Sequence, residues 1–224
     1  MIGRPHVHHR VTDSTNERAK DLAAAGAPHG TLVTADEQTA GRGRQGRTWS
    51  AAPGESLLLS VVLRSPDELL PLRAAVAVAE SIPVAAHIKW PNDVWIEGRK
   101  VSGILVEGRP QEGWAVLGIG LNVTTRSFPE ELAGIATSLA LASGAPPSRD
   151  KVLDALVASL DRLLTADAAD VLAAWRERDA LLGAPVAWDG GRGRGAGITD
   201  SGALRVETDA GIVELDAGEV HLRR

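Results

Sequence analysis

Two apolar runs limit the folds that this chain can adopt. Residues 56–63, SLLLSVVL, are apolar at nearly every position, which is typical of a central strand buried on both faces of a sheet. Residues 114–123, WAVLGIGLNV, form a second buried strand, which Gly118 and Gly120 interrupt. Glycine inside a strand often marks a place where a ligand or another backbone approaches closely. The sequence therefore predicts a buried sheet with such an approach on one of its central strands.

The segments around these runs alternate between strands and helices, as in an α/β protein. The first helix is expected to begin at a capping box formed by Ser14 and Glu17 and to end at Gly26. The other expected helices cover residues 70–79, 148–164, with Ser148 as its cap, and 167–178. Further strands are expected over residues 6–11, 31–35, 87–90, 94–96 and 100–107.

The pattern changes after Gly183. Short alternating runs separated by Gly or Asp predict a small all-β domain of about 45 residues. We place the two domains at 1–179 and 180–224. The segment GGRGRG, from Gly190 to Gly195, is expected to form a glycine-rich hairpin turn. The expected strands cover residues 186–188, 197–198, 203–207, 211–215 and 219–222.

The stretch 38–50, QTAGRGRQGRTWS, carries the strongest functional signal. Three arginines and three glycines lie between Gly41 and Arg47. Glycine lets the main chain come close to a ligand, and a guanidinium group can bind phosphate or carboxylate through two hydrogen bonds. Trp49 adds a flat face for a ring. The stretch matches neither Walker A nor GxGxxG. It predicts a mobile loop that closes over an anionic, partly aromatic ligand, with a merely solvated loop as the alternative.

Composition excludes several classes of protein. The net charge of −5 and the pI near 5.7 argue against general binding to nucleic acid or membrane surfaces. Without cysteine there is no disulfide, thiolate metal site or thiol nucleophile. The N-terminal MIGRPHVHHR lacks a signal-peptide core, and we expect a cytoplasmic protein. The three histidines of this segment have no partners at metal-ligand spacing, so we do not expect a metal there.

Five motifs occur in order along the chain, namely DSTN (13–16), QTAGRGRQGRTW (38–49), KWPND (89–93), KVSGILVE (100–107) and LGIGLN (117–122). In this order and at this spacing they resemble the biotin protein ligases over nearly the whole chain. The resemblance implies a catalytic α/β domain related to class II aminoacyl-tRNA synthetases, with a central mixed sheet flanked by helices. It also implies that the C-terminal part, which includes residues 218–223, is a small SH3-like β-barrel.

The same resemblance implies a two-step reaction. Biotin and MgATP give biotinyl-5′-adenylate and pyrophosphate, and the ε-amine of a lysine then attacks this mixed anhydride. The acceptor would be the biotin carboxyl carrier domain of a biotin-dependent carboxylase such as acetyl-CoA carboxylase. Because a carboxylate and the α-phosphate of ATP are both anions, the enzyme must supply positive charge. Arg42, Arg44 and Arg47 on the loop and Lys100 on a strand can supply it.

Residue roles follow from the resemblance. The catalytic residues would be Lys100, which contacts both the biotin carboxylate and the α-phosphate, Arg44, which shields the adenylate, and Arg42. Trp49 would cover the adenine. Residues implied for biotin binding are Ser14, Thr15, Asn16, Gln38, Gly41, Arg42, Gly43, Arg44, Lys100 and Gly103. Those implied for ATP or the adenylate are Arg44, Arg47, Trp49, Asn92, Lys100 and Asn122. The Mg²⁺ ligands stay open, with Asn92, Asp93 and Asn122 as candidates.

The chain also departs from the family pattern. Only thirteen residues precede Ser14, too few for the winged helix-turn-helix of the repressor members, so DNA binding is not expected. Because tyrosine is absent and phenylalanine occurs once, the apolar pocket wall should consist of Trp, Leu, Ile and Val. The alternative interpretations are a lipoate ligase, an octanoyl transferase, a biotin-sequestering protein and an RNA-binding protein. The resemblance also implies that two chains can pair into a homodimer.

Overall fold

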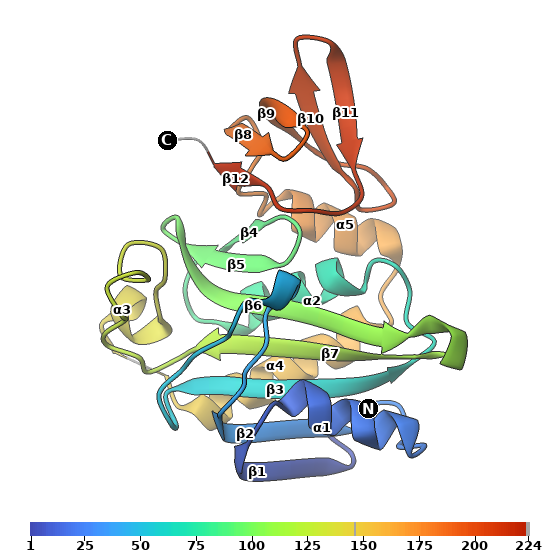
Figure 1. Cartoon of the computed structure of the whole chain (residues 1–224), viewed down its shortest axis with the longest axis vertical. Helices are drawn as coiled ribbons and strands as arrows, with labels where there is room; N and C mark the ends of the chain where they lie inside the picture. The colour runs from blue at the N-terminus through green and yellow to red at the C-terminus, as the bar shows by residue number, and fades with distance from the viewer. Residues whose placement is uncertain (146, 223–224) are drawn as a thin grey trace.

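The computed structural model of the chain describes residues 1–145 and 147–222, and a seven-stranded mixed sheet forms its centre (Figure 1). The strand order is β1-β2-β3-β7-β6-β5-β4, with β1 and β2 parallel and all other neighbours antiparallel. The predicted mixed sheet is therefore confirmed. Its strands are β1 (His6–Thr12), β2 (Leu32–Gln38), β3 (Ser56–Arg64), β4 (His87–Lys89), β5 (Asp93–Ile96), β6 (Arg99–Arg109) and β7 (Trp114–Asn122).

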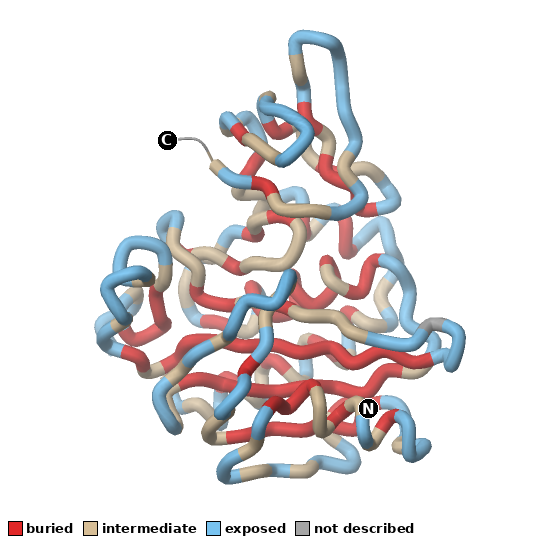
Figure 2. The backbone as a smooth tube through the Cα atoms, viewed as in Figure 1, coloured by how far each residue is buried: buried red, intermediate tan, exposed pale blue. Residues whose placement is uncertain are grey.

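Strands β3 and β7 lie side by side at the buried centre of this sheet (Figure 2). Every residue of β7 is buried, and so is every residue of β3 except Arg64. Their register places Ser60 opposite Gly118 and Leu58 opposite Gly120. The two apolar runs are thus the two central strands that the sequence predicts. They are apolar at nearly every position because both faces of the sheet are covered.

Helices cover both faces (Figure 1). Helix α1 (Thr15–Ala24) packs on one face against β2, β3 and β7. On the other face α2 (Leu70–Ser81) packs against α4 (Arg149–Leu163) and α5 (Ala168–Arg176). These four helices confirm the predicted ones to within a few residues. Three short elements were not predicted, namely α3 (Leu139–Ser143) and the 3₁₀ turns η1 (Arg44–Gly46) and η2 (Pro110–Glu112).

The capping box predicted for the first helix is wrong. Ser14 occupies the N-cap position, but its side chain makes no capping hydrogen bond. The amide oxygen of Gln38, at the end of β2, instead accepts from the Thr15 N–H at 2.7 Å. Glu17 turns away and pairs with Lys20. Tertiary contacts have replaced the local cap, which leaves the Ser14 hydroxyl available to another partner. Ser148 likewise precedes α4 without a side-chain cap.

The C-terminal part forms a second, antiparallel sheet with the order β11-β10-β9-β8-β12. The GGRGRG segment corrects a prediction, because only Asp189 and Gly190 form the turn and Gly191–Ile198 is strand β9. A side chain at Gly193 would overlap the backbone of Glu207, and one at Gly195 that of Leu181. Here glycine permits close strand packing. The other strands are β8 (Pro185–Trp188), β10 (Leu204–Thr208), β11 (Gly211–Leu215) and β12 (His221–Leu222).

One hydrophobic core runs through both parts of the chain and includes residues such as Leu70, Trp175, Val186 and Leu204. Trp90 Nε1 also donates to the Gly202 carbonyl at 3.0 Å, which ties the KWPND turn to the second sheet. The boundary at 179/180 stays a prediction, and Arg223 of the C-terminal segment lies outside the described residues. Within the described ranges, no helix has both the length and the apolar character needed to span a membrane.

The fold generates a prediction about Arg73, a buried arginine of α2. Its guanidinium group bonds Asp67 and donates to the carbonyls of Leu163 and Ala166 at 2.7 and 2.8 Å, which joins α2 to the end of α4. Arg73→Met should lower the free energy of unfolding by about 2–4 kcal/mol, because it leaves buried hydrogen-bond acceptors without a donor. Urea denaturation measures this. The control Arg109→Met, at an exposed ion pair, should change it by less than about 1 kcal/mol; equal losses would contradict the prediction.

Candidate active site

A cavity of about 300 Å³ lies between the glycine-arginine loop and the central strands β3, β6 and β7. The start of α1 forms one end, and the segment 128–136 forms another wall. Two of the residues with predicted or candidate roles, Gly41 and Asp93, do not line it. The cavity brings together the other predicted residues, which are Ser14, Thr15, Asn16, Gln38, Arg42, Gly43, Arg44, Arg47, Trp49, Asn92, Lys100, Gly103 and Asn122.

The loop folds back on itself and crosses in front of β6 (Figure 1). Gly43 N–H donates to the Arg47 carbonyl at 2.7 Å, and Trp49 N–H donates to the Gly41 carbonyl at 3.0 Å. At the tip, Gln45 has a φ of 55°. A side chain at Gly41 would overlap the Trp49 carbonyl oxygen. Gly41 therefore closes the base of the loop, which explains why it lies outside the cavity.

The ring of Trp49 packs directly against the backbone of two strands. A Cβ at Gly120 of β7 would overlap this ring, and a Cβ at Gly103 of β6 would lie 3.0 Å from Trp49 Cζ3. At Gly118 the side chain of Asn16 occupies the corresponding space. The close approach predicted from the glycines of the central strand is confirmed. The groups that approach are side chains of the protein itself, which come from the loop and from α1.

The three loop arginines have different partners. Arg42 pairs with Glu17 of α1 and, at 3.1 Å, with Glu107 of β6. Arg47 pairs with Glu219. Arg44 donates to neutral oxygens, Asn92 Oδ1 at 3.0 Å and the Gly218 carbonyl at 3.3 Å, and makes no ion pair within the described part of the chain. Of the three, Arg44 thus keeps a charge that no carboxylate of these residues neutralises.

Lys100 reaches the same cavity from β6. Its Nζ lies 2.7 Å from Asp93 Oδ1 and 5.7 Å from the centroid of the Trp49 ring. Lys89, the first residue of the KWPND motif, lies close by with its Nζ 5.5 Å from the Trp95 ring. Burial lowers the pKa of Lys89, and the attraction of Asp93 opposes this shift. Two lysines therefore lie beside one carboxylate at this end of the site.

At the start of α1, small polar side chains bond one another. Gln38 Oε1 accepts from both Thr15 N–H and Thr15 Oγ1, at 2.7 and 3.0 Å. Ser60 Oγ of β3 lies 2.8 Å from Thr15 Oγ1 and donates to Asn16 Oδ1 at 2.6 Å. Buried polar groups need such partners. The DSTN motif therefore presents an ordered row of oxygen and nitrogen atoms along the cavity.

The apolar wall differs in part from the prediction. Trp49, Leu and Ile side chains line it as expected, but no valine of the described residues does, and Phe128 joins them. Leu132, Ile135 and Ala136 were also missed, because the segment after β7 has no helical or alternating period. The backbone of Lys100 holds this segment: Lys100 N–H donates to the Ile135 carbonyl, and Thr137 N–H donates to the Lys100 carbonyl, both at 2.8 Å.

Each candidate metal ligand has a partner within the protein. Asn92 Nδ2 donates to the Ile104 carbonyl at 2.8 Å, and Asn122 Nδ2 donates to the Thr137 carbonyl at 3.0 Å. Asp93 is held by Lys100. Among the described residues there is no group of three His, Cys, Asp or Glu side chains that could hold a metal ion. The two asparagines instead fix the strands and the segment that surround the cavity.

The Trp49 contact generates a double-mutant test. Gly120→Ala should reduce the free energy of unfolding by about 1–3 kcal/mol, because the new methyl group overlaps the Trp49 ring. In a Trp49→Ala background the same substitution should cost less than about 0.5 kcal/mol, since the overlapping ring is gone. Chemical denaturation of the four proteins gives the coupling. Equal costs in both backgrounds would show that the ring does not occupy this position.

Comparison with known proteins agrees with this geometry. Residues 8–123 match the Biotin/lipoate A/B protein ligase family, and residues 192–223 match the Biotin protein ligase C terminal domain. The chain is 36% identical over 244 residues to the bifunctional ligase/repressor BirA of Bacillus subtilis, covering 99% of this chain and 75% of BirA. It is 37% identical over 235 residues to a biotin–[acetyl-CoA-carboxylase] ligase of Mycobacterium tuberculosis, covering 95% and 87% of the two chains.

Among solved structures, the biotin protein ligase from Aquifex aeolicus in complex with biotin and ATP aligns with a TM-score of 0.87 and 31% identity, covering 98% of both chains. The chain therefore belongs to the biotin protein ligases, within the Biotin/lipoate A/B protein ligase family.

Proposed function

We propose that the cavity behind the glycine-arginine loop binds biotin and ATP together and carries out both steps of the biotin protein ligase reaction. The observation that carries this proposal is the composition of the walls of one cavity. The polar row at the start of α1, an apolar wall, and the cations Arg44 and Lys100 all face it. Biotin has a polar ring, an apolar chain and a carboxylate, which fit these three regions in turn. The Aquifex aeolicus relative is described with biotin and ATP bound.

In the first step, a biotin carboxylate oxygen attacks the α-phosphorus of ATP, the bond to the β-phosphate oxygen breaks, and pyrophosphate leaves. In the second, the amine of the acceptor lysine attacks the carbonyl carbon of biotinyl-5′-AMP, loses a proton, and releases AMP. Both steps gather negative charge near the α-phosphate, so fixed cations aimed there lower the barrier. Closure of the loop would keep water from the mixed anhydride. The mobility of the loop and its closure over a ligand both stay predictions.

The roles of individual residues are part of this proposal. Lys100 contacts the biotin carboxylate and the α-phosphate, and Arg44, which makes no ion pair with another described residue, shields the adenylate. Arg42 is paired with two carboxylates, so we assign it mainly to the biotin end. Trp49 covers the adenine. Ser14, Thr15, Asn16, Gln38, Gly43 and Gly103 form the biotin site with Arg42, Arg44 and Lys100, while Gly41, outside the cavity, shapes the base of the loop. Arg47, Asn92 and Asn122 join Trp49, Arg44 and Lys100 around ATP.

Magnesium enters this proposal as part of the substrate MgATP. The described residues include no group of three His, Cys, Asp or Glu side chains that could hold a metal ion, and Mg²⁺ commonly keeps several waters and binds through substrate phosphates. We therefore assign no protein residue as a metal ligand and route no step through one.

The acceptor that we propose is the biotin carboxyl carrier domain of a biotin-dependent carboxylase. The relatives from Mycobacterium tuberculosis and Paracoccus denitrificans are named for acetyl-CoA carboxylase, which supports this class of acceptor. Pairing of two chains also stays a prediction.

Biotin-dependent exchange of labelled pyrophosphate into ATP tests the first step. We expect exchange with biotin and none with lipoate or octanoate, because the polar row matches the biotin ring. A folded protein that binds biotin without exchange would revive the biotin-sequestering alternative. Exchange with lipoate would show that the pocket is misassigned.

Lys100→Ala should lower the rate of adenylation at least about tenfold, since a charge-assisted hydrogen bond contributes about 1.5–3 kcal/mol. Its thermal stability should stay near that of the unsubstituted protein because the Lys100 side chain is one-third exposed. Lys151→Ala, at an exposed position of α4, is the control and should leave the rate unchanged. Near-normal adenylation by Lys100→Ala would remove Lys100 from the mechanism.

A further inference from the structure

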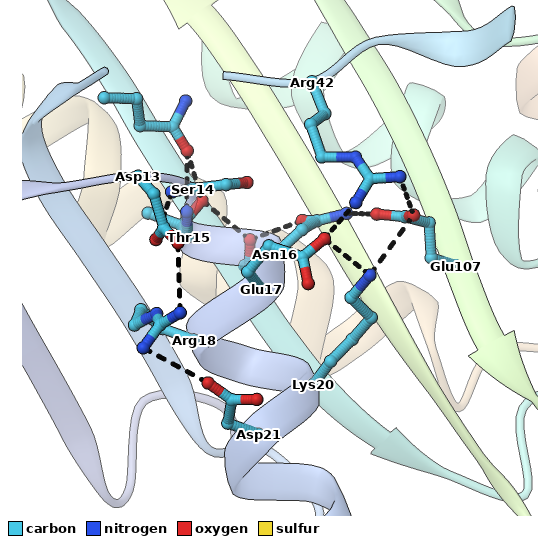
Figure 3. A network of polar contacts seen from close by, with 12 residues as sticks. Asp13, Ser14, Thr15, Asn16, Glu17, Arg18, Lys20, Asp21, Arg42 and Glu107 are labelled. Carbon is cyan, nitrogen blue, oxygen red and sulfur yellow. Dashed lines mark hydrogen bonds and ion pairs between the residues drawn. The ribbon is translucent and has the colours of Figure 1, made fainter. Parts of the chain in front are cut away.

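Glu107, the last residue of the KVSGILVE motif, has no role in the reaction as described above. Its carboxylate nevertheless joins three segments (Figure 3). Oε2 accepts from Asn16 Nδ2 at 2.9 Å, while Oε1 lies 3.1 Å from Arg42 Nη2 and 3.5 Å from Lys20 Nζ. We propose that Glu107 is a positioning residue for biotin, which fixes the Asn16 amide and holds Arg42 at the biotin end of the cavity. This inference rests on the proposed function of the cavity.

The first consequence concerns the orientation of Asn16, a residue that is 4% exposed and lines the cavity. The two ends of a carboxamide have nearly the same shape, so their hydrogen-bond partners decide which end points where. A carboxylate only accepts, so Glu107 selects the NH₂ end of Asn16. Ser60 Oγ donates to the other end at 2.6 Å. Together the two partners leave the amide a single satisfied orientation.

The second consequence reaches the rest of the polar row. Ser60 Oγ, which bonds Asn16, also lies 2.8 Å from Thr15 Oγ1, and Thr15 in turn donates to Gln38. All of these except Ser60 line the cavity. If Asn16 turned over, its NH₂ group would face Ser60 and the row would have to rearrange. Glu107 therefore anchors the order of donors and acceptors that biotin meets.

The third consequence concerns the loop. Arg42 bridges Glu107 and Glu17, and Lys20 Nζ lies 2.7 Å from Glu17 and 3.5 Å from Glu107. Two carboxylates and two cations thus form a balanced group (Figure 3). Without the charge of Glu107, Arg42 and Lys20 would share Glu17 alone. The first arginine of the loop would then lose the contact that ties it to β6.

The two oxygens of Glu107 have separate tasks, which makes Glu107→Gln a sharp test. Oε2 accepts a hydrogen bond from Asn16, and Oε1 pairs with Arg42 and Lys20. A glutamine places one NH₂ group where the carboxylate has an oxygen, so it must face either Asn16 Nδ2 or the cations with a donor. One of the two contacts is lost in either orientation, although the side chain keeps its size.

An ion pair that merely ties α1 to β6 is the alternative explanation. Lys20→Met distinguishes positioning of biotin from a simple ion-pair tie. It removes a cation from the group but leaves the Asn16 and Arg42 contacts of Glu107 intact. A simple tie would be weakened by both substitutions. Positioning of biotin would be disturbed by Glu107→Gln alone.

The experiment measures biotin binding by calorimetry without ATP, together with the KM for biotin and for ATP in pyrophosphate exchange. For Glu107→Gln we expect the Kd and the KM for biotin to rise at least about tenfold, equivalent to about 1.4 kcal/mol. The KM for ATP should change less than about threefold, which is under 1 kcal/mol. Lys20→Met should leave all three constants within about threefold. Thermal melts verify that each variant is folded, and Glu107→Ala serves as a second variant if Glu107→Gln does not fold.

Each outcome separates the hypotheses. Failure of the unsubstituted protein to bind biotin would overturn the proposed function itself. Normal binding by the unsubstituted protein with an unchanged biotin Kd in folded Glu107→Gln would overturn only the role of Glu107. Equal losses in Glu107→Gln and Lys20→Met, or equal changes in the two KM values, would assign the contacts to general tethering of α1.

Discussion

The site depends on the contact between the Trp49 ring and the bare backbone of two central strands. Gly103 and Gly120 leave a shallow depression on the face of the sheet, and the loop places the ring into it. A flat aromatic group can approach a strand closely only where no Cβ stands in the way. The contact holds the loop against the sheet beside the cavity that Arg42, Arg44 and Arg47 line. Lys100 Nζ lies 5.7 Å from the centroid of the same ring.

Charge is distributed unevenly over this arrangement. Four carboxylates, on α1, β5, β6 and the segment before β12, pair with Arg42, Arg47 and Lys100, whereas Arg44 contacts only neutral oxygens among the described residues. Paired cations are held in place, and an unpaired one exerts its full attraction on an incoming anion. Such preorganised positive charge suits a reaction in which two anions must meet. The acidic composition of the chain as a whole does not reveal this local distribution of charge.

Much of the fold was predictable because the signals are local. The runs 56–63 and 114–123 have no polar face, and they became the buried strands β3 and β7. Helix periods located α2, α4 and α5. Predictions failed where a distant residue replaced a local partner. Gln38 took the place of the Ser14 cap, and most of the GGRGRG segment, predicted as a turn, belongs to the closely packed strand β9. The aperiodic wall that contains Phe128 and Ile135 had no local signal at all.

The sequence by itself determined the order of the elements, the central strands and the set of chemical groups available, since backbone propensity, periodicity and motif order are encoded along the chain. The tertiary structure alone decided which groups meet. Glu107 lies 91 residues from Asn16, yet their side chains are hydrogen-bonded, and Arg44 reaches across 174 residues to Gly218. Hydrogen bonds and ion pairs act over a few ångströms in space, and a sequence records no such distance until the sheet has formed.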